Sequence, residues 1–134
     1  MKKTVDNEEA FAKALEEDAD FIEIEGSLAE KTIRIKAVGQ VAWIIAFGSI
    51  IVAMTAVFLT MGSGGTAAPV TTAFMAVSAP VAVSTLGIGT TVAIGSLVFA
   101  AGNIKAAKLL FSKLRSDYVI KEKRNGYLLL EKKK

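Results

Sequence analysis

The chain divides into three parts according to where its charged residues fall. From Ala37 to Ile104 there is no Asp, Glu, Lys or Arg, whereas the stretches on either side are densely charged. An uncharged run of that length is most stable in a lipid bilayer. We therefore expect a membrane α-helical hairpin of two transmembrane helices, carried by a small α+β cytoplasmic cap. The expected parts are residues 1–38, 39–103 and 104–134.

The uncharged run is long enough for two crossings. A helical span needs roughly 20 apolar residues, and the first is expected at about 41–61, before the glycine-rich turn at 62–66. The second is expected at about 81–101, with Ser78 as its N-cap and Pro80 in its first turn. Residues 67–79 then form a connection at the far side of the membrane.

The chain could cross the membrane twice, or three times if residues 67–84 also cross. The basic residues at the ends of the uncharged run decide between these two topologies. Lys and Arg flank both ends of the run, and basic flanks stay on the cytoplasmic side. The number of crossings is therefore even, which predicts a multi-pass protein of the cell (inner) membrane with both termini cytoplasmic. The side chains expected to contact anionic lipid headgroups are Lys31, Arg34, Lys36, Lys105 and Lys108.

The N-terminal part reads as helix, strand and helix. A capping box at Asp6–Glu9 predicts a helix that ends near Asp18. Residues 21–25 alternate apolar and acidic positions, which predicts a half-buried strand with Ile22 and Ile24 on one face. Gly26 ends that strand.

A second capping box, Ser27 with Glu30, predicts a helix from Leu28 to about Val38. The alternation over 33–36 also fits a strand, so both interpretations stay open at this point. Gly39 offers a bend before the first span.

The C-terminal part completes the cap. Residues 103–115 are expected to continue the second span as a basic amphipathic helix. Strand-like runs at 117–123 and 127–132 flank Asn125-Gly126, the strongest short signal for a β-hairpin, whose two central residues both take positive φ.

A lone hairpin is marginally stable in water, so we expect the strand at 21–25 to join it as a third strand, backed by the helix at 7–18. The acidic side chains Glu23 and Glu25 would then face some of Lys121, Lys123 and Lys132.

Small residues recur along both expected spans at alternating spacings of four and three. Such seams let helices approach closely in lipid. We interpret them as the contact within one hairpin rather than between copies. The large residues Ile44, Phe47, Ile51, Met54 and Phe58 mostly lie off the first seam and suit lipid. The helix-packing candidates are Ala42, Ala46, Ser49, Ala53 and Ala56 in the first span, and Gly89, Ala93, Ser96 and Ala100 in the second.

Composition narrows the chemistry. The chain has no Cys and no His, which removes disulfides, thiolate metal sites and the commonest proton shuttle. The acidic residues at 16–20 are interpreted as a solvated helix end rather than an acid–base site. No phosphate-binding or dinucleotide motif is complete. We predict no catalytic, cofactor-binding or metal-binding residue.

Charge is unevenly distributed. Residues 1–36 carry six basic and ten acidic side chains, whereas 105–134 carry ten basic and three acidic ones. Because this basic cluster lies beside the predicted membrane, anionic lipid is a better partner for it than nucleic acid. Trp43 is expected to anchor the first span at the interface, and Asn103 to bond across the seam or to headgroups.

The sequence predicts a non-enzymatic membrane protein with a structural or interaction role, either a membrane-anchored adaptor or a self-associating subunit. Its partners would be the bilayer and another copy or another membrane protein. The alternative is a membrane-permeabilising, toxin-like, pore-forming protein. A third interpretation, a soluble protein that hides the hairpin until triggered, is disfavoured because so few residues remain to cover two spans.

Overall fold

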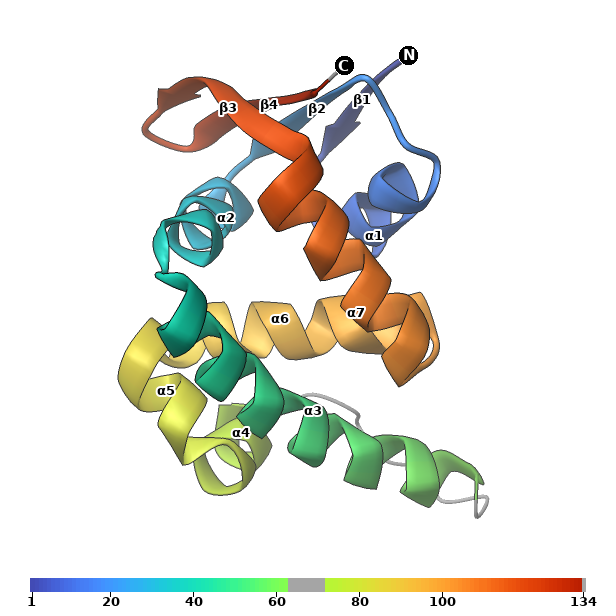
Figure 1. The fold of residues 1–134 in the computed structure, drawn as a ribbon, viewed down its shortest axis with the longest axis vertical. Coiled ribbons are helices and arrows are strands. Elements are labelled where there is room, and N and C mark those ends of the chain that lie inside the picture. Colours follow the sequence, from blue (N-terminus) through green and yellow to red (C-terminus); the bar gives the residue numbers. More distant parts are fainter. Residues whose placement is uncertain (63–71, 134) are drawn as a thin grey trace.

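The computed structural model describes residues 1–62 and 72–133, which form a mostly helical protein with one sheet (Figure 1). Seven α-helices, one π-helical turn (η1) and four strands lie within these residues. In chain order the elements are β1 (Lys2–Val5), α1 (Glu8–Glu16), β2 (Phe21–Glu25), α2 (Ser27–Ala37), α3 (Gln40–Gly62), α4 (Thr72–Ser78), α5 (Pro80–Leu86), α6 (Ile88–Ala101), α7 (Ile104–Ser112), η1 (Lys113–Asp117), β3 (Tyr118–Arg124) and β4 (Tyr127–Lys132).

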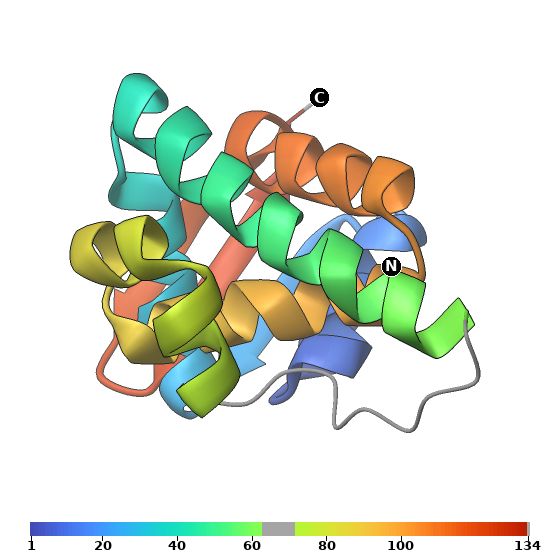
Figure 2. The same ribbon diagram turned by 90° about the horizontal axis from the view of Figure 1, so that it is seen from below.

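The elements stack in layers. The sheet covers α1, α2 and the α7–η1 helix, α6 runs beneath these, and α3, α4 and α5 form the far layer (Figure 1). Seen from that far side, α3 crosses the face obliquely with α4 and α5 beside it (Figure 2). Both termini lie at the sheet end, as the close pairing of β1 with β2 and of β4 with β2 requires.

The sheet confirms the three predicted strands and adds one. Its order is β1-β2-β4-β3, with β1 parallel to β2 and the other two pairs antiparallel. The first strand was missed because it has only four residues, two of which are lysines. Ile22 and Ile24 are fully buried, as the alternation predicted.

The predicted lysine partners of β2 were wrong. Because β4 lies between β2 and β3, Lys121 and Lys123 stand two strands away from Glu23. Glu23 instead accepts hydrogen bonds from the hydroxyls of Tyr127, at 2.7 Å, and Thr4, at 3.1 Å. Lys121 pairs with Glu131 within the hairpin, and Lys132 pairs with Asp18.

Local turn and cap chemistry also differs from prediction. In the hairpin only Gly126 takes a positive φ, of 75°, and Asn125 does not share it. The N-cap of α1 is Asn7 rather than Asp6, because the Asn7 side chain accepts the Ala10 N–H at 2.8 Å. Residues 27–37 are helical, and Ser27 makes no side-chain cap.

The buried residues of α2 explain why helix prevails over strand at 33–36. Leu28, Thr32 and Ile35 recur at helical spacing and are buried, whereas Ile33 is only half-buried. A strand would have placed Ile33 and Ile35 on the same face.

The second predicted span is not one helix. The chain turns by 120° between α5 and α6 at Gly87, whose φ is 86°. A left-handed residue stops the helix there, and the neighbouring Gly, Ser and Thr residues add little helix propensity. Pro80 does lie in the first turn of α5, but its N-cap is Ala79 rather than Ser78.

A second interruption follows α6. Gly102 takes the left-handed conformation, and the Asn103 side chain then caps α7 by accepting the Ala106 N–H at 2.8 Å. The predicted continuous helix from the second span through 103–115 was therefore wrong. The expected connection at 67–79 coincides with α4 over its last part, while 67–71 lie outside the described residues.

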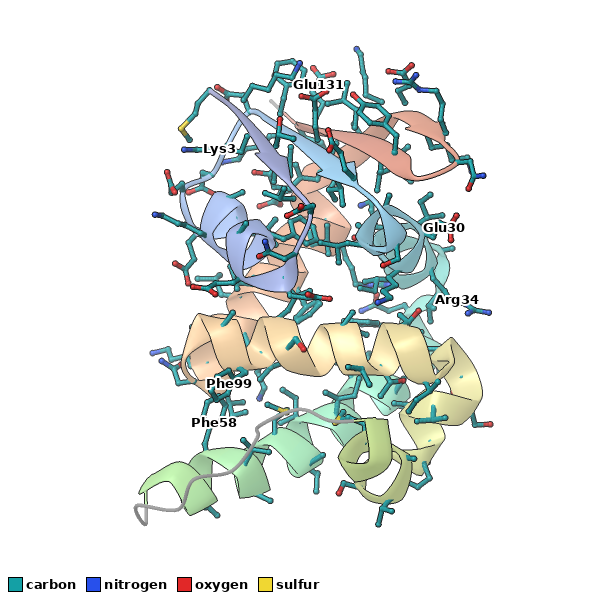
Figure 3. All side chains as sticks on the ribbon, turned by 180° about the vertical axis from the view of Figure 1, so that it is seen from behind. Lys3, Glu30, Arg34, Phe58, Phe99 and Glu131 are labelled. Atoms are coloured by element: carbon teal, nitrogen blue, oxygen red, sulfur yellow. The ribbon has the colours of Figure 1, made fainter. Side chains whose placement is uncertain are left out.

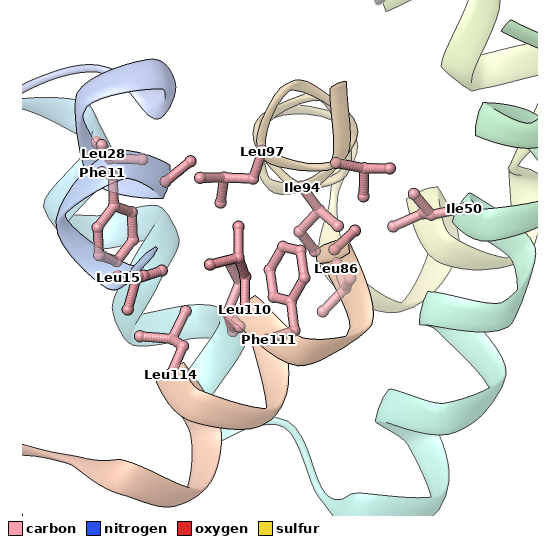
Figure 4. Packing of buried hydrophobic residues seen from close by; sticks show 14 of the residues in the cluster. Phe11, Leu15, Leu28, Ile50, Leu86, Ile94, Leu97, Leu110, Phe111 and Leu114 are labelled. Atoms are coloured by element: carbon pink, nitrogen blue, oxygen red, sulfur yellow. The ribbon is translucent and has the colours of Figure 1, made fainter. Parts of the chain in front are cut away.

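The core is centred on α6. Thr90, Thr91, Ala93, Ile94, Gly95, Leu97 and Val98 are all buried. On one side of α6 lie Phe11, Leu15 and Leu28 with side chains of α7 and η1, and on the other lie Ile50 and Leu86 (Figure 4). A segment predicted to face lipid is instead the helix around which the two halves of the protein pack.

Candidate functional site

The most unusual surface of the described protein is the face formed by α3, α4 and α5, which we call the apolar layer. Several large apolar side chains on it are largely exposed. Val52 is 71% exposed, Leu59 69% and Val77 82%. The others exposed there are Val41, Ile44, Ile45 and Val81. Soluble monomers rarely leave so many large apolar side chains together on one face.

Within this layer, α3 is apolar all round. Residues Gln40–Leu59 are long and apolar enough to cross a membrane, yet only 33% of their most apolar window is buried inside the protein. A helix that is apolar on every face belongs in a large protein core or in lipid. Among the described residues only α3 has this character alone; α5 and α6 reach it only when taken as one span despite their 120° bend.

The protein buries one side of α3, and this side only partly follows the predicted packing seam. Its buried residues are Trp43, Ala46, Ile50, Ala53, Met54 and Val57. Of the predicted seam residues, Ala46 and Ala53 thus lie on the buried side of α3, whereas Ala42 and Ala56 are exposed and Ser49 is half-buried. Met54, expected to face lipid, is fully buried.

In α6, Ala93 is buried, Ser96 and Ala100 are half-buried, and Gly89 is exposed. The structure does not bring the two predicted seams together along their length. Instead α3 packs chiefly against α5, and α6 lies against α1 as well as against α3. Whether the exposed small residues contact another helix stays a prediction.

The chain enters and leaves the apolar part through a reciprocal clamp, which we call the junction and define by Lys36 and Arg115. Lys36, at the end of α2, donates to the carbonyl oxygens of Leu114 and Tyr118, both at 2.7 Å. Arg115, in η1, donates to the carbonyl oxygens of Ile35 at 2.6 Å and Val38 at 3.0 Å.

Each cation therefore satisfies carbonyl groups that the other element leaves free at its C-terminal end, where positive charge is also favoured by the helix dipole. Burial lowers the pKa of both groups, and for Lys36 the neighbouring Lys133 and Arg115 lower it further. Lys36 was predicted as a headgroup contact, but its ammonium group points into the protein.

Next to the junction, aromatic rings join α3 to α7. Trp43 stacks on Phe47 with 5.0 Å between ring centroids, and Phe111 lies 5.5 Å from Trp43. The guanidinium carbon of Arg115 lies 4.7 Å from the Trp43 ring centroid, a cation–π contact. Trp43 is only 6% exposed, so it packs within the protein rather than projecting as a free anchor.

A groove of about 430 Å³ follows this aromatic cluster between α3 and α7. Its walls combine the aromatic rings of Trp43, Phe47 and Phe111 with the cationic side chains of Lys108 and Arg115. A second aromatic contact joins the far part of α3 to α6, where Phe58 and Phe99 stack with 6.3 Å between ring centroids (Figure 3).

The other predicted headgroup residues lie on the outside. Lys105 and Lys108 are exposed on α7, Arg34 is exposed on α2, and Lys31 is half-buried beside the corner between α5 and α6. They lie between the sheet and the apolar layer, which is the level at which lipid headgroups would meet a protein seated on its apolar layer.

The acidic residues after α1 are held in ion pairs. Asp18 lies 3.1 Å from Lys113 and 3.2 Å from Lys132, and hydrogen bonds from these two ammonium groups lower its pKa. The N-terminal ammonium lies 2.6 Å from Asp20 and lowers the pKa of that carboxyl as well. These contacts tie the start and end of the chain to the turn before β2.

Sequence reasoning missed the junction because its partners are backbone carbonyls roughly eighty residues apart. The available signal was the position of Lys36 and Arg115 at element C-termini, where basic residues often bind the last carbonyls. In the described parts of the chain, no group of three or more metal-ligating side chains comes together. No family model, no curated protein and no solved structure matches the chain.

Proposed function

We propose that this chain is a small, non-enzymatic integral membrane protein that holds an α/β cap at the cytoplasmic face of the cell (inner) membrane. The observation that carries the proposal is the exposed, uniformly apolar α3, which the rest of the protein covers on one side only. Lipid is the solvent that would stabilise such a helix.

The length of α3 fits one crossing. Its 23 residues extend about 35 Å at 1.5 Å per residue, against a hydrocarbon thickness of about 30 Å. In this proposal α4 and α5 belong to the return towards the cap, which ends at Gly87, where the chain bends into α6. The number of crossings remains even, and both termini are cytoplasmic.

The cap supplies the interaction role. Strand β3 pairs with β4 on one side only, and its other edge carries no strand among the described residues. Its side chains after Tyr118 are exposed and include Lys121, Glu122 and Lys123. A charged open edge resists uncontrolled strand pairing but offers a specific partner backbone groups to bind. We infer an adaptor or a self-associating subunit with this edge facing the cytoplasm.

Single-cysteine labelling tests the topology cleanly because the chain contains no cysteine. Leu59→Cys places a thiol near the far end of α3, and Lys121→Cys places one on the cap. With a membrane-impermeant maleimide, we expect intact cells to label only Leu59→Cys and permeabilised cells to label both. Labelling of Lys121→Cys in intact cells would place the cap outside and overturn the proposal.

A third outcome is also informative. If neither thiol is labelled in intact cells while both proteins resist carbonate extraction, α3 lies within one leaflet instead of crossing. That result would keep the membrane location and overturn the crossing.

A further inference from the structure

The corner between α5 and α6 faces α2 across a cavity of about 380 Å³. The residues that matter for its chemistry are Glu30, Lys31 and Arg34 on α2, and Gly87, Gly89 and Thr90 at the start of α6. Figure 3 shows Glu30 and Arg34 on the α2 side of this corner. The cavity lies between the cap and the apolar layer, at the N-terminal end of α6.

The start of α6 presents donors that nothing in the described chain uses. Its first backbone hydrogen bond runs from the Thr91 N–H to the Gly87 carbonyl. The N–H groups of Ile88, Gly89 and Thr90 therefore precede the helical ladder, and no side chain caps them. These groups, with the helix dipole behind them, favour an anion.

Two cationic side chains rest against the glycines of this turn. A Cβ atom built on Gly87 would lie 3.1 Å from the Arg34 Nη1 atom, and one on Gly89 would lie 3.7 Å from the Lys31 Cε atom. The absence of side chains at these two positions lets both cations approach the backbone donors closely. Neither Lys31 nor Arg34 forms an ion pair or hydrogen bond with another described residue.

Thr90 provides the independent observation that points to a ligand. The residue is only 4% exposed, yet it lines the cavity. None of the hydrogen bonds of the described residues involves its hydroxyl, whereas the neighbouring Thr91 hydroxyl donates to the Gly87 carbonyl at 2.8 Å. Because no buried side-chain oxygen of the described residues is left without a partner, the Thr90 hydroxyl itself reaches solvent, and the cavity is the space that Thr90 lines. A hydroxyl without a partner in the protein, on an otherwise buried residue that lines the cavity at a helix N-terminus, suits an external acceptor.

Glu30 is the one acidic side chain on the cavity wall. It is exposed, so water weakens the field of its carboxylate in the cavity. The cavity therefore offers an anion two cationic side chains, three backbone N–H donors and one hydroxyl, and only one solvated carboxylate repels it.

We propose that this corner binds a phosphate group, and that the phosphate belongs to an anionic lipid at the cytoplasmic surface. The lipid source rests on the proposed membrane function, because that function places the cavity at headgroup depth. The phosphate chemistry rests only on the cavity itself. Lys31 and Arg34 were predicted as headgroup contacts, and this site gives them a defined partner.

The test uses the full chain in a neutral detergent, so it does not depend on how the protein crosses a membrane. The probes are dihexanoyl phosphatidic acid, dihexanoyl phosphatidylcholine and inorganic phosphate. The readout is the backbone amide resonance of Gly89, assigned with Gly89→Ala. We expect phosphatidic acid to shift this resonance saturably, inorganic phosphate to shift it more weakly, and phosphatidylcholine to have little effect.

Variants separate the site from general charge attraction. Lys31→Ala/Arg34→Ala should weaken phosphatidic acid binding by about a hundredfold, and Thr90→Val by about tenfold, because hydrogen bonds to a charged group are strong. Glu30→Gln should tighten binding a few-fold. The matched control Lys105→Ala/Lys108→Ala removes the same charge from α7 and should leave the Gly89 shift unchanged.

Three results would overturn the proposal. If no phosphate compound shifts the Gly89 resonance, this corner does not bind phosphate. If the shift is unchanged in Lys31→Ala/Arg34→Ala, the two cations do not take part in binding. A shift with inorganic phosphate alone excludes the lipid as the source. Since the cysteine labelling measures crossing and this titration measures phosphate binding, either proposal can fail without the other.

Discussion

The cap and the apolar layer differ in the partners that their side chains find within the protein. In the cap, charged groups meet partners: Asp18 pairs with two lysines, Glu23 accepts from two hydroxyls, and Lys36 and Arg115 bind carbonyl groups. In the apolar layer, several large valine, isoleucine and leucine side chains are more than half exposed.

The surface of the cap is therefore compatible with water. The exposed side chains of the apolar layer would be stabilised by contact with another apolar phase. The contacts of the cap account for the stability of its fold, and the exposed face of α3 is the feature on which the proposed membrane location rests.

The largest expected effect comes from placing a charge on that uncovered face. Val52 lies near the middle of α3 and is 71% exposed. In lipid, Val52→Lys should cost about 2.5–3.5 kcal/mol of insertion free energy. In water the same exposed substitution would change stability by no more than about 0.5 kcal/mol. The measurement is the fraction of protein in the carbonate-resistant membrane pellet.

The matched control is Val119→Lys on β3, since Val119 is also exposed but belongs to the cap. We expect the control to stay in the membrane pellet like the wild type and Val52→Lys to be lost from it. Equal retention of the two variants would mean that the face of α3 does not meet lipid.

The second effect concerns the junction. Arg115→Leu leaves the Ile35 and Val38 carbonyls without their donor in a partly buried place. We expect the free energy of unfolding to fall by about 2–3 kcal/mol, because buried acceptors left unpaired are costly. Denaturation in detergent measures it, and the emission of Trp43, the only tryptophan of the chain, should change as its ring loses the guanidinium that lies 4.7 Å from its centroid.

Arg124→Leu serves as the control because Arg124 is an exposed arginine of the same cap, stacked on Tyr127 at 4.4 Å. It should cost no more than about 0.5 kcal/mol. If both variants lose the same stability, the junction is not a special contact.

The elements of the cap could be predicted because their signals are local. Alternation over 21–25 identified β2, and Asn125-Gly126 between two strand-like runs identified the hairpin. Strand order and partners could not follow from these signals. Placing β4 in the centre depends on how Ile22 and Ile24 meet Leu130 and Leu128 across the sheet.

The apolar part shows where hydropathy alone fails. A charge-free run does not say which of its helices face lipid and which are covered by protein. The bend at Gly87 was not predicted because the apolar composition continues through it. Gly89 was predicted to lie in a helix-packing seam within one continuous span, whereas the chain breaks two residues earlier, at Gly87, and α6 begins there.

A third effect separates contacts within the protein from contacts between copies. Ala46 is fully buried on α3, whereas Ala42, one turn earlier, is exposed. Ala46→Leu adds bulk inside a packed core and should lower the free energy of unfolding by about 2 kcal/mol. Ala42→Leu should leave folding nearly unchanged, and chemical denaturation of the two variants compares them directly.

The same pair tests self-association. If copies meet through the exposed small residues of α3, Ala42→Leu should lower the oligomeric state in detergent, measured by light scattering, without loss of folding. An oligomer unaffected by Ala42→Leu would mean that copies, if they associate, do so elsewhere. Dye leakage from liposomes with wild type that disappears in Ala42→Leu would favour the pore over the adaptor.

The smallest effect belongs to Tyr118, which closes the cap over the turn after α1. Its side chain is 1% exposed and its hydroxyl donates to the Ala19 carbonyl at 2.6 Å. Burial, aided by the negative charges of Asp18, Asp20 and Asp117, raises the pKa of Tyr118 from 10.0 to about 12. The unfolded chain therefore releases this proton at a lower pH than the folded protein does.

The stability linked to this proton is consequently present in full below pH 10 and is lost as the pH rises from 10 towards about 12. Tyr118→Phe should lower the free energy of unfolding by about 1 kcal/mol at neutral pH, through the lost hydrogen bond. It should also flatten the alkaline loss of stability, so that the curves of variant and wild type converge above pH 10. Tyr127→Phe is the comparison variant, because Tyr127 is the only other tyrosine of the chain. Its hydroxyl donates to the Glu23 carboxylate at 2.7 Å, which raises the pKa of Tyr127 as well, so this variant reports the share of the alkaline loss that does not come from Tyr118. Equal slopes for wild type and Tyr118→Phe between pH 10 and 12 would show that Tyr118 ionises as freely in the folded cap as in the unfolded chain.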